Sequence, residues 1–168
     1  CSNNEYAGED ISILTFNRLN KTSINSVSEV LEKLSPDIIG LQESYDLGLQ
    51  IADRFGYCFY GSKDASTSVL SKYPIEDINE SYCKIHLNDS LYINFFNIHL
   101  PAYPYQPYDI RDTLITTPNQ ALHQAEQTRG TQVNLLLELI NSIENNMPMI
   151  LVGDFNEPSH LDWVMGSE

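Results

Sequence analysis

Polar side chains follow four apolar segments of the chain, each at or beside the point where a short strand is expected to end. They are Asn17, Glu43, His99 and the pair Asp154 and Asn156. Strand ends in layered α/β folds are common places for a site, because rigid strands fix the side chains while the following loops leave room for a ligand. Taken singly, each has a structural explanation as a turn residue, a solvated carboxylate or a structural histidine. Their coincidence favours one shared site.

These residue types suit the hydrolysis of a phosphoester. That reaction calls for a hard divalent cation, an activated water and neutralisation of charge on the phosphoryl oxygens. Glu43 would supply an oxygen ligand for Mg²⁺, and Asn17 would orient that ligand shell or a phosphate oxygen. Asp154 would hold the nucleophilic water, His99 would donate to the phosphoryl oxygen, and Asn156 would bind a further phosphate oxygen.

The elements that must position these side chains alternate between strand and helix patterns. Residues 11–16 and 37–42 have the apolar runs of strands, and 23–34 and 46–55 have the spacing of amphipathic helices. A meander of strands is expected next, then a long helix and a last buried strand, at 57–60, 67–71, 75–87, 91–98, 121–143 and 149–152. The order predicts a mixed α/β fold with sheet covered by helices, in one domain over 1–168 after a flexible leader at 1–10.

Residues 101–119 are rich in proline and tyrosine and lack periodicity, so they are expected to form a long loop. Compact domains rarely keep such a loop without a use. Tyr108 and Arg111 are therefore predicted to face the substrate, since a phenol and a cation suit recognition of a phosphate and its headgroup. The alternative is that Arg111 pairs with Asp109 or Asp112 on the surface.

Acidic residues outnumber basic ones by 23 to 9, which gives a formal net charge of -14. Such a charge repels polyanions, so avid non-specific binding of nucleic acid is disfavoured unless cations or a basic patch intervene. The acidity also has a simpler explanation, because a charged surface keeps proteins soluble. Charge alone does not identify a substrate.

The first residue is Cys1, followed by a polar run, and no segment approaches the roughly 18 apolar residues of a spanning helix. This start resembles the amino terminus of a mature bacterial lipoprotein after removal of its signal peptide. The alternative is that the sequence was simply cut at this position. We therefore expect an exported or cell-surface protein that contacts a membrane only through a lipid on Cys1. In that setting a disulfide between Cys58 and Cys83 is permitted, and two buried thiols are the alternative.

Five motifs stand in an order that resembles the endonuclease/exonuclease/phosphatase superfamily, the DNase I-like proteins, over essentially the whole chain. They are Leu-Thr-Phe-Asn at 14–17, Ile-Gly-Leu-Gln-Glu-Ser at 39–44, Thr-Ser-Val-Leu-Ser-Lys-Tyr-Pro-Ile at 67–75, Asn-Ile-His-Leu at 97–100 and Gly-Asp-Phe-Asn at 153–156. The longer run to Trp163 is similar to a bacterial secreted or surface subgroup.

The resemblance implies a four-layer α/β/β/α sandwich with the site between its two sheets. It implies that Glu43 binds Mg²⁺ or Mn²⁺, with Asn17 close by. It further implies that His99 contacts the scissile phosphate, that Asp154 orients or activates the attacking water, and that Asn156 hydrogen-bonds phosphate.

The carboxyl end departs from the family pattern, which continues with further strands, an Asp and then an Asp-His pair. Only five residues follow Trp163, and His160 follows Asp154 too closely to replace the family's final histidine. We therefore expect an incomplete sandwich that is weakly active or inactive alone. Its uncovered sheet surface would favour self-association.

The sequence thus predicts a metal-dependent hydrolase of a phosphoester, a phosphodiesterase or phosphatase, in its complete form. The alternative is a non-catalytic surface lipoprotein or binding module that retains the fold. Members of the resembled superfamily act on DNA, RNA, inositol phosphates and sphingolipid headgroups, and fold does not choose among them. The acidity and the expected lipid anchor favour a small or lipid-derived phosphodiester.

Overall fold

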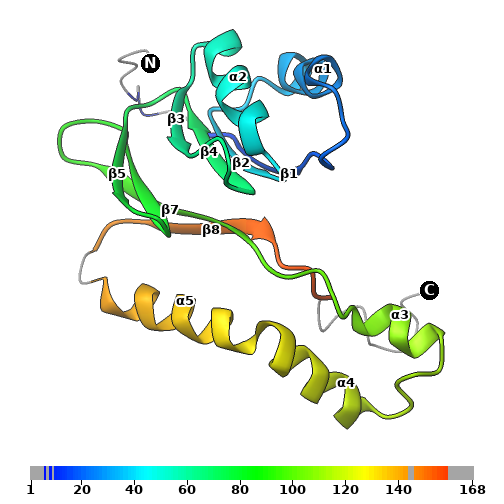
Figure 1. The fold of residues 1–168 in the computed structure, drawn as a ribbon. Coiled ribbons are helices and arrows are strands. Elements are labelled where there is room, and N and C mark those ends of the chain that lie inside the picture. Colours follow the sequence, from blue (N-terminus) through cyan, green and yellow to red (C-terminus); the bar gives the residue numbers. More distant parts are fainter. Residues whose placement is uncertain (1–5, 7, 9, 144–145, 159–168) are drawn as a thin grey trace. The chain divides into compact units, whose positions relative to one another are not determined.

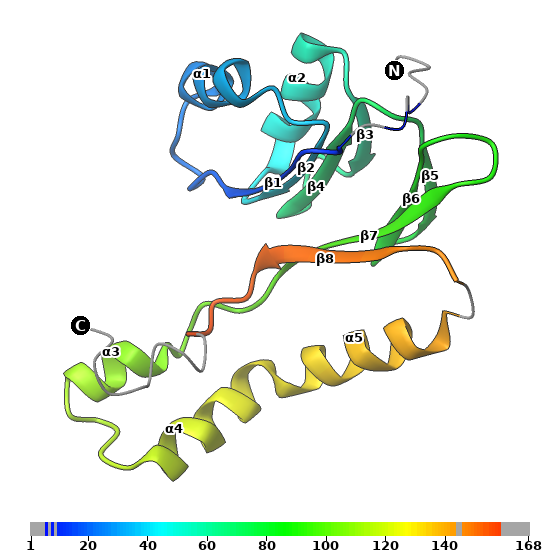
Figure 2. The ribbon, with the colours of Figure 1, turned by 180° about the vertical axis from the view of Figure 1, so that it is seen from behind.

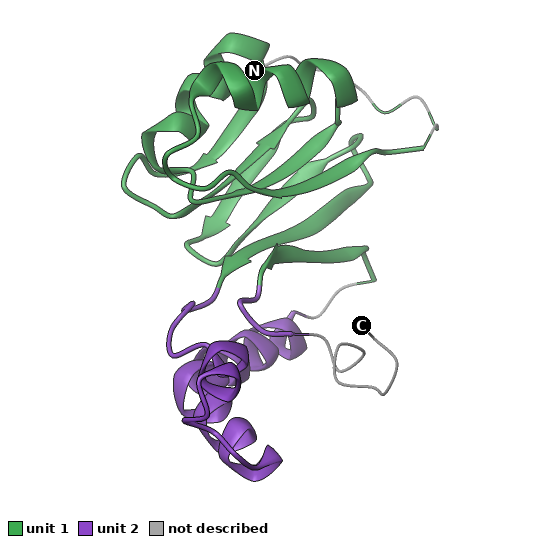
Figure 3. Ribbon diagram, turned by 90° about the vertical axis from the view of Figure 1, so that its right-hand side faces the viewer, with its two compact units in different colours: residues 1–99, 146–154 green, residues 100–145, 155–168 purple. Residues whose placement is uncertain are grey.

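The computed structural model describes residues 6, 8, 10–143 and 146–158. The chain divides into two compact units, which are described separately (Figure 3). The first unit comprises residues 1–99 and 146–154, and the second comprises residues 100–145 and 155–168. Cys1, His160 and Trp163 lie outside the described residues, so the expectations that concern them stay predictions.

The first sheet of the first unit has four strands in the order β1-β2-β4-β3. Strands β1 and β2 are parallel, and β4 is antiparallel to both of its neighbours. All five residues of β2 are buried, as its continuous apolar run predicted. The strands are β1 (Ile13–Asn17), β2 (Ile38–Gln42), β3 (Cys58–Gly61) and β4 (Thr67–Ser71).

Two amphipathic helices cover the outer face of this sheet (Figures 1 and 2). Helix α1 (Ile24–Leu34) begins after Ser23, whose side chain caps the helix by accepting from the Ser26 backbone N–H at 3.2 Å. Helix α2 (Tyr45–Phe55) ends at Gly56, which takes the left-handed conformation that glycine favours. Both helices thus lie where the sequence predicted them.

The second sheet has the strand order β5-β6-β7-β8. Strands β5, β6 and β7 form an antiparallel meander, and β8 joins β7 in parallel. The single meander expected from residue 57 onward is wrong in its first part, because β3 and β4 pair in the first sheet. The strands are β5 (Ile75–Asn79), β6 (Tyr82–His86), β7 (Tyr92–His99) and β8 (Met149–Asp154). The α/β class and its two mixed sheets are therefore confirmed.

Two apolar cores hold the layers of the first unit together. The outer core lies between the helices and the first sheet, and the inner core lies between the sheets. The outer core includes Val27, Leu31, Ile39, Leu41, Ile51 and Leu70. The inner core includes Ile38, Val69, Cys83, Ile85, Ile93 and Phe95. Alternate residues of β2 and β4 thus serve opposite faces of the same sheet.

The single strand expected at 75–87 is wrong, because the chain reverses after Asn79. The Asn79 side chain accepts from the Ser81 backbone N–H at 2.8 Å, which closes a tight turn between β5 and β6. Apolar residues continue on both sides of this turn, so the pattern resembled one strand. Asparagine followed by two polar residues was the signal for the turn.

The second unit corrects two further expectations. Residues 101–119 are not all loop, because they contain α3 (Gln106–Arg111) and the start of α4 (Pro118–Ala125). The helix expected at 121–143 is interrupted by a π-helical turn at Glu126–Gly130 before α5 (Thr131–Ser142). At Gly130 the Glu126 carboxylate fills the space that a Cβ would occupy. The π-helical turn therefore packs this carboxylate where glycine has no side chain.

Cys83 is a free and fully buried thiol on β6, so it is not disulfide-bonded to Cys58. Burial raises the pKa of the Cys83 thiol to about 12, because its surroundings disfavour the thiolate. Cys83 is therefore a small apolar residue of the inner core. No described helix is long and apolar enough to cross a membrane.

Candidate active site

Four of the predicted site residues lie together in the first unit. Asn17 and His99 are the last residues of β1 and β7, Asp154 is the last of β8, and Glu43 directly follows β2. Each sheet contributes a parallel pair, in which Asn17 is level with Gln42 and His99 is level with Asp154. Parallel pairing brings these strand ends to the same edge of each sheet.

The Asn17 amide connects the two carboxylates of the site. Its Nδ2 donates to Asp154 Oδ2 at 2.8 Å and lies 3.3 Å from Glu43 Oε1. Its Oδ1 accepts from the Leu19 backbone N–H at 2.9 Å, which fixes the orientation of the amide. Asn17 therefore joins a residue of the first sheet to one of the second, and it orients both carboxylates.

Glu43 is held in an uncommon backbone conformation, with φ of 52°. A left-handed conformation costs a non-glycine residue about 1–3 kcal/mol and is often found at functional sites. Its Oε2 accepts from the Asn20 backbone N–H at 2.7 Å. The carboxylate is thus directed by both its own backbone and the loop after β1.

Arg18 stabilises that loop, a role that the sequence analysis missed. Its guanidinium is buried and donates to the carbonyl oxygens of Asn20 at 2.8 Å, Thr22 at 3.2 Å and Ser44 at 3.4 Å. Arg18 thus ties the loop after β1 to Ser44, the residue that follows Glu43. This connection keeps the Asn20 N–H directed at the Glu43 carboxylate. The signal in the sequence was an arginine directly after the strand-end asparagine.

His99 lies beside Asp154 at the end of the second sheet. The His99 Nε2 is 4.0 Å from Asp154 Oδ2, and the two side chains are 17% and 29% exposed. Partial exposure keeps both groups accessible to water and substrate, while partial burial strengthens electrostatic interactions between them. An imidazole beside a carboxylate can hold a proton for a phosphoryl oxygen or a leaving group.

The donor set fits a hard divalent cation such as Mg²⁺ or Mn²⁺. The carboxylates of Glu43 and Asp154 both approach one amide donor, Asn17, and carboxylate oxygens are the ligands that such cations prefer. No group of three or more His, Cys, Asp or Glu side chains suited to a metal occurs among the described residues. A cation here would therefore complete its coordination with waters and substrate oxygens, which Mg²⁺ commonly does.

Gly153 sets the direction in which Asp154 enters the site. Its φ is 151°, and a Cβ would lie 2.7 Å from Ile98 Cγ1 and closer still to the Ile98 carbonyl oxygen. We expect Gly153→Ala to lower the free energy of unfolding by about 3 kcal/mol, because the methyl group is both strained and overpacked. Urea denaturation measures this loss.

Gly56→Ala is the matched control for that substitution. Gly56 also has a positive φ, 72°, but no atom lies within 4 Å of the added Cβ. Its cost should be about 1–2 kcal/mol, from the left-handed conformation alone. Equal losses at the two glycines would contradict the close approach of Gly153 to β7.

The remaining predicted site residues belong to the second unit. Asn156 has a left-handed backbone with φ of 48°, and its Nδ2 donates to the Leu100 carbonyl at 2.8 Å. Arg111 forms a bidentate ion pair with Asp112 at 2.7 and 2.9 Å, and its guanidinium lies 4.9 Å from the centre of the Tyr108 ring. This is the surface pairing that the sequence left open. Roles for Asn156, Tyr108 and Arg111 in substrate binding stay predictions.

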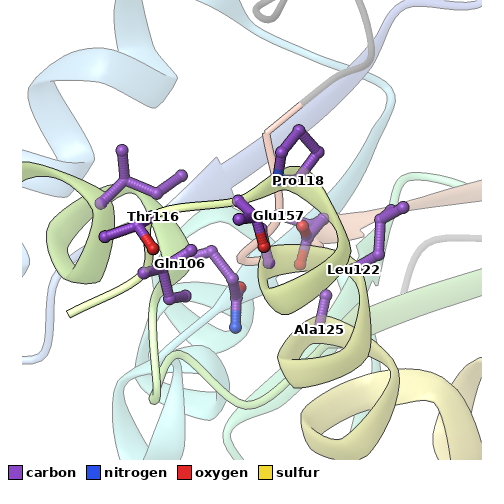
Figure 4. A pocket seen from close by; sticks show the side chains of 10 residues that line it. Gln106, Thr116, Pro118, Leu122, Ala125 and Glu157 are labelled. Atoms are coloured by element: carbon purple, nitrogen blue, oxygen red, sulfur yellow. The ribbon is translucent and has the colours of Figure 1, made fainter. Parts of the chain in front are cut away.

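The second unit also contains a cavity of about 590 Å³ between α3, α4 and Glu157 (Figure 4). Its walls are mainly apolar, with Ile110, Ile115, Ala121, Leu122 and Ala125 among them. Beside it the buried Arg129 pairs with Glu157 and donates to Gln106 and to the Pro101 carbonyl. The ion pair compensates both charges, so the cavity presents a largely neutral wall.

Residues 14–168 match the model of the Endonuclease/Exonuclease/phosphatase family. The chain belongs to this family. The match includes the described site residues Asn17, Glu43, His99 and Asp154. The superfamily resemblance of the five motifs is therefore confirmed.

The chain spans only about half to two thirds of the length of the following relatives. It is 26% identical over 175 residues to the uncharacterized protein F14F9.5 of Caenorhabditis elegans, covering 91% of the chain and 55% of that protein. The structure of humanized D. rerio TDP2 is 18% identical with a TM-score of 0.61, covering 89% of this chain and 63% of that one. An AP endonuclease from Archaeoglobus fulgidus is 16% identical with a TM-score of 0.54, over 86% and 57%. These likenesses show a shared DNase I-like fold.

Proposed function

We propose that the protein hydrolyses a phosphoester, specifically a phosphodiester, with the help of a divalent cation. The observation that carries this proposal is the approach of Glu43 and Asp154 to the Asn17 amide, with His99 beside Asp154. Two carboxylates and one imidazole at the ends of rigid strands form the kind of constellation that phosphoryl transfer needs. Membership of the family supports the same conclusion.

Glu43 would hold the cation, Mg²⁺ or Mn²⁺, together with oxygens of water and substrate. When bound, the cation would neutralise charge that develops on the phosphoryl oxygens. Asn17 orients the Glu43 carboxylate, and its own Oδ1 is engaged by the Leu19 N–H. Asn17 is therefore proposed to orient Glu43. To coordinate the cation directly, its Oδ1 would first have to release the hydrogen bond from the Leu19 N–H.

Asp154 would orient the attacking water and accept its hydrogen bond, because the Asn17 donor directs the carboxylate at the end of β8. His99 would donate to a phosphoryl oxygen. Asn156, two residues after Asp154, would contact phosphate once its amide is released from the Leu100 carbonyl. The water would form a bond to phosphorus as the bond to the leaving oxygen breaks. Its proton would pass to Asp154, the leaving oxygen would take a proton from solvent, and His99 would stabilise negative charge on a phosphoryl oxygen.

Two substrate classes follow from different observations. The net charge of -14 favours a small or lipid-derived phosphodiester, because a polyanion is repelled. The crystal structure of D. rerio TDP2, which shares the fold, contains a single strand DNA product, and this favours single-stranded DNA. An acidic protein can still accept a strand end, since only a few phosphates need contact it.

The proposal is tested with the longest gene product that contains this chain. Turnover of a small phosphodiester, a lipid-derived phosphodiester and single-stranded DNA is measured with Mg²⁺, after EDTA, and after Mg²⁺ is restored. We expect at least one substrate to be cleaved, with cleavage lost on chelation and recovered on addition of the metal. Chelator-resistant turnover would contradict the metal dependence.

The alternative is a binding module that retains the fold without catalysis, anchored at a bacterial cell surface through Cys1. Folded protein that cleaves none of the three substrates, yet is recovered with membranes in a Cys1-dependent manner, would support it. Mature-protein mass spectrometry that finds no lipid on Cys1 would remove the anchoring part of this alternative.

A further inference from the structure

An amide bridge, buried at Gln42 and partly buried at Asn97, joins the two sheets next to the candidate site. Gln42 Nε2 donates to Asn97 Oδ1 at 2.6 Å. Asn97 Nδ2 donates in turn to the carbonyl oxygens of Leu41 at 3.0 Å and Ser68 at 2.8 Å, on adjacent strands of the first sheet. Two carbonyl acceptors fix the orientation of the Asn97 amide, because only its nitrogen can donate.

The sequence makes room for this bridge. A Cβ at Gly40 would lie 2.5 Å from Val152 Cγ2 and 3.1 Å from Asn97 Cγ, so the glycine lets the second sheet approach closely. Gln42 is 1% exposed, and its Nε2 also lies 3.0 Å from the Gly40 carbonyl. Polar groups shielded from water need hydrogen-bond partners within the protein, and the amides of Gln42 and Asn97 both have them.

The bridge is close in sequence to residues of both halves of the site. Gln42 directly precedes Glu43, and Asn97 lies two residues before His99 and so faces the same side of β7. Apolar contact between the sheets is not directional, whereas a hydrogen bond weakens steeply with distance and angle. The amide pair can therefore fix the register between the sheets, which the inner core alone cannot.

We propose that Gln42 and Asn97 are positioning residues that hold Glu43 and Asn17 at the distance from His99 and Asp154 that the reaction requires. This inference rests on the proposed hydrolase function. Without the bridge, the two sheets remain packed and Asn17 still donates to Asp154, but β2 and β7, whose ends carry Glu43 and His99, lose their own fixed separation. Misplacement of about 1 Å can lower a rate by about 100-fold.

A second hydrogen bond between the same sheets provides a matched control. Tyr60 on β3 donates its hydroxyl to the Asn79 carbonyl on β5. Those strands are at the sheet edges remote from β1 and β8, so this contact stabilises the sandwich without bordering the site. Tyr60→Phe removes it with little change in shape.

The experiment compares Asn97→Leu, Gln42→Met and their double variant with Tyr60→Phe in the longest gene product. The replacements approximate the native volumes, and urea denaturation establishes that each variant is folded. Two properties are measured: kcat for a small phosphodiester, and the broadening of the His99 ring NMR signals by Mn²⁺. Broadening falls steeply with the distance between Mn²⁺ and the ring, so it reports the separation of the site's halves without turnover.

We expect kcat to fall by about 10- to 100-fold in Asn97→Leu, which removes all three hydrogen bonds of the bridge, and by less in Gln42→Met, which leaves Asn97 donating to the Leu41 and Ser68 carbonyls. The double variant should lose no more than Asn97→Leu, because no further hydrogen bond of the bridge is then removed. Mn²⁺ broadening of His99 should weaken severalfold in the same variants. Tyr60→Phe should keep wild-type kcat and broadening despite reduced stability.

Unchanged kcat and broadening in folded Asn97→Leu would overturn the inference while leaving the proposed function intact. Equal losses in Tyr60→Phe would also overturn it, since the effect would then be general weakening of the sandwich. Wild-type protein with neither turnover nor Mn²⁺ broadening of His99 would end both the proposed function and the inference that depends on it.

Discussion

Asp154→Asn is expected to lower kcat for phosphodiester hydrolysis by about 10²- to 10⁴-fold, the range that general acid-base assistance supplies. Asparagine keeps an oxygen that can accept from the Asn17 Nδ2, now at 2.8 Å from the carboxylate, so the connection between the sheets is retained. What is lost is the negative charge that orients water and lies 4.0 Å from the His99 ring. The variant should therefore fold normally and bind substrate while turnover collapses.

Asp77→Asn is the control for this substitution. Asp77 is an exposed carboxylate on β5, at the edge of the second sheet opposite β8. It undergoes the same change in charge and volume as Asp154→Asn. Steady-state kinetics should show wild-type kcat for Asp77→Asn. Comparable losses in the two variants would show that net charge of the sheet, rather than the position of Asp154, determines the rate.

Glu43→Gln is expected to weaken Mg²⁺ binding by about 10- to 100-fold. Mutation of residues that only hydrogen-bond to metal ligands already causes losses of this size. Glutamine retains an oxygen for the Asn20 N–H, which the carboxylate accepts at 2.7 Å. It removes the charge that a hard cation requires from its protein ligand. Isothermal titration calorimetry with MgCl₂ measures the difference, and turnover should recover in part at high Mg²⁺.

Glu32→Gln on α1 is the matching control, since Glu32 is an exposed carboxylate that lies 3.9 Å from the exposed Arg54 guanidinium. Exposed pairs of this kind contribute little to stability. Its Mg²⁺ affinity should equal that of the wild type. Unchanged affinity in Glu43→Gln would remove Glu43 as a metal ligand and with it the metal-dependent mechanism.

The strand ends that carry the site could be predicted from the sequence because their signals are local. Apolar runs end at Asn17, Glu43, His99 and Asp154, and each run is short enough to be a strand. Parallel pairing then places the residues of each sheet side by side, at Asn17 with Gln42 and His99 with Asp154. The family motifs supplied the expectation that both sheets face one site.

Local signals failed where a few polar residues redirect an otherwise continuous pattern. The turn after Asn79 is closed by one side-chain contact, from Asn79 to Ser81. The π-helical turn ends at Gly130, where the Glu126 carboxylate occupies the space of a Cβ. Helix α3 lies in a proline-rich segment whose composition favoured a loop. Periodicity cannot report such contacts, because it averages over several residues.

The sequence by itself determined the α/β class, the strand ends and the chemistry of the residues placed there. The tertiary structure decided how those residues meet. The Asn17 and Asp154 side chains are hydrogen-bonded across 137 positions of sequence, and Gln42 and Asn97 across 55. Such contacts follow from the register and separation of two sheets, which are set by packing throughout the core. Residue types can therefore propose a site, whereas only the packed sheets fix the distances at which its groups can act.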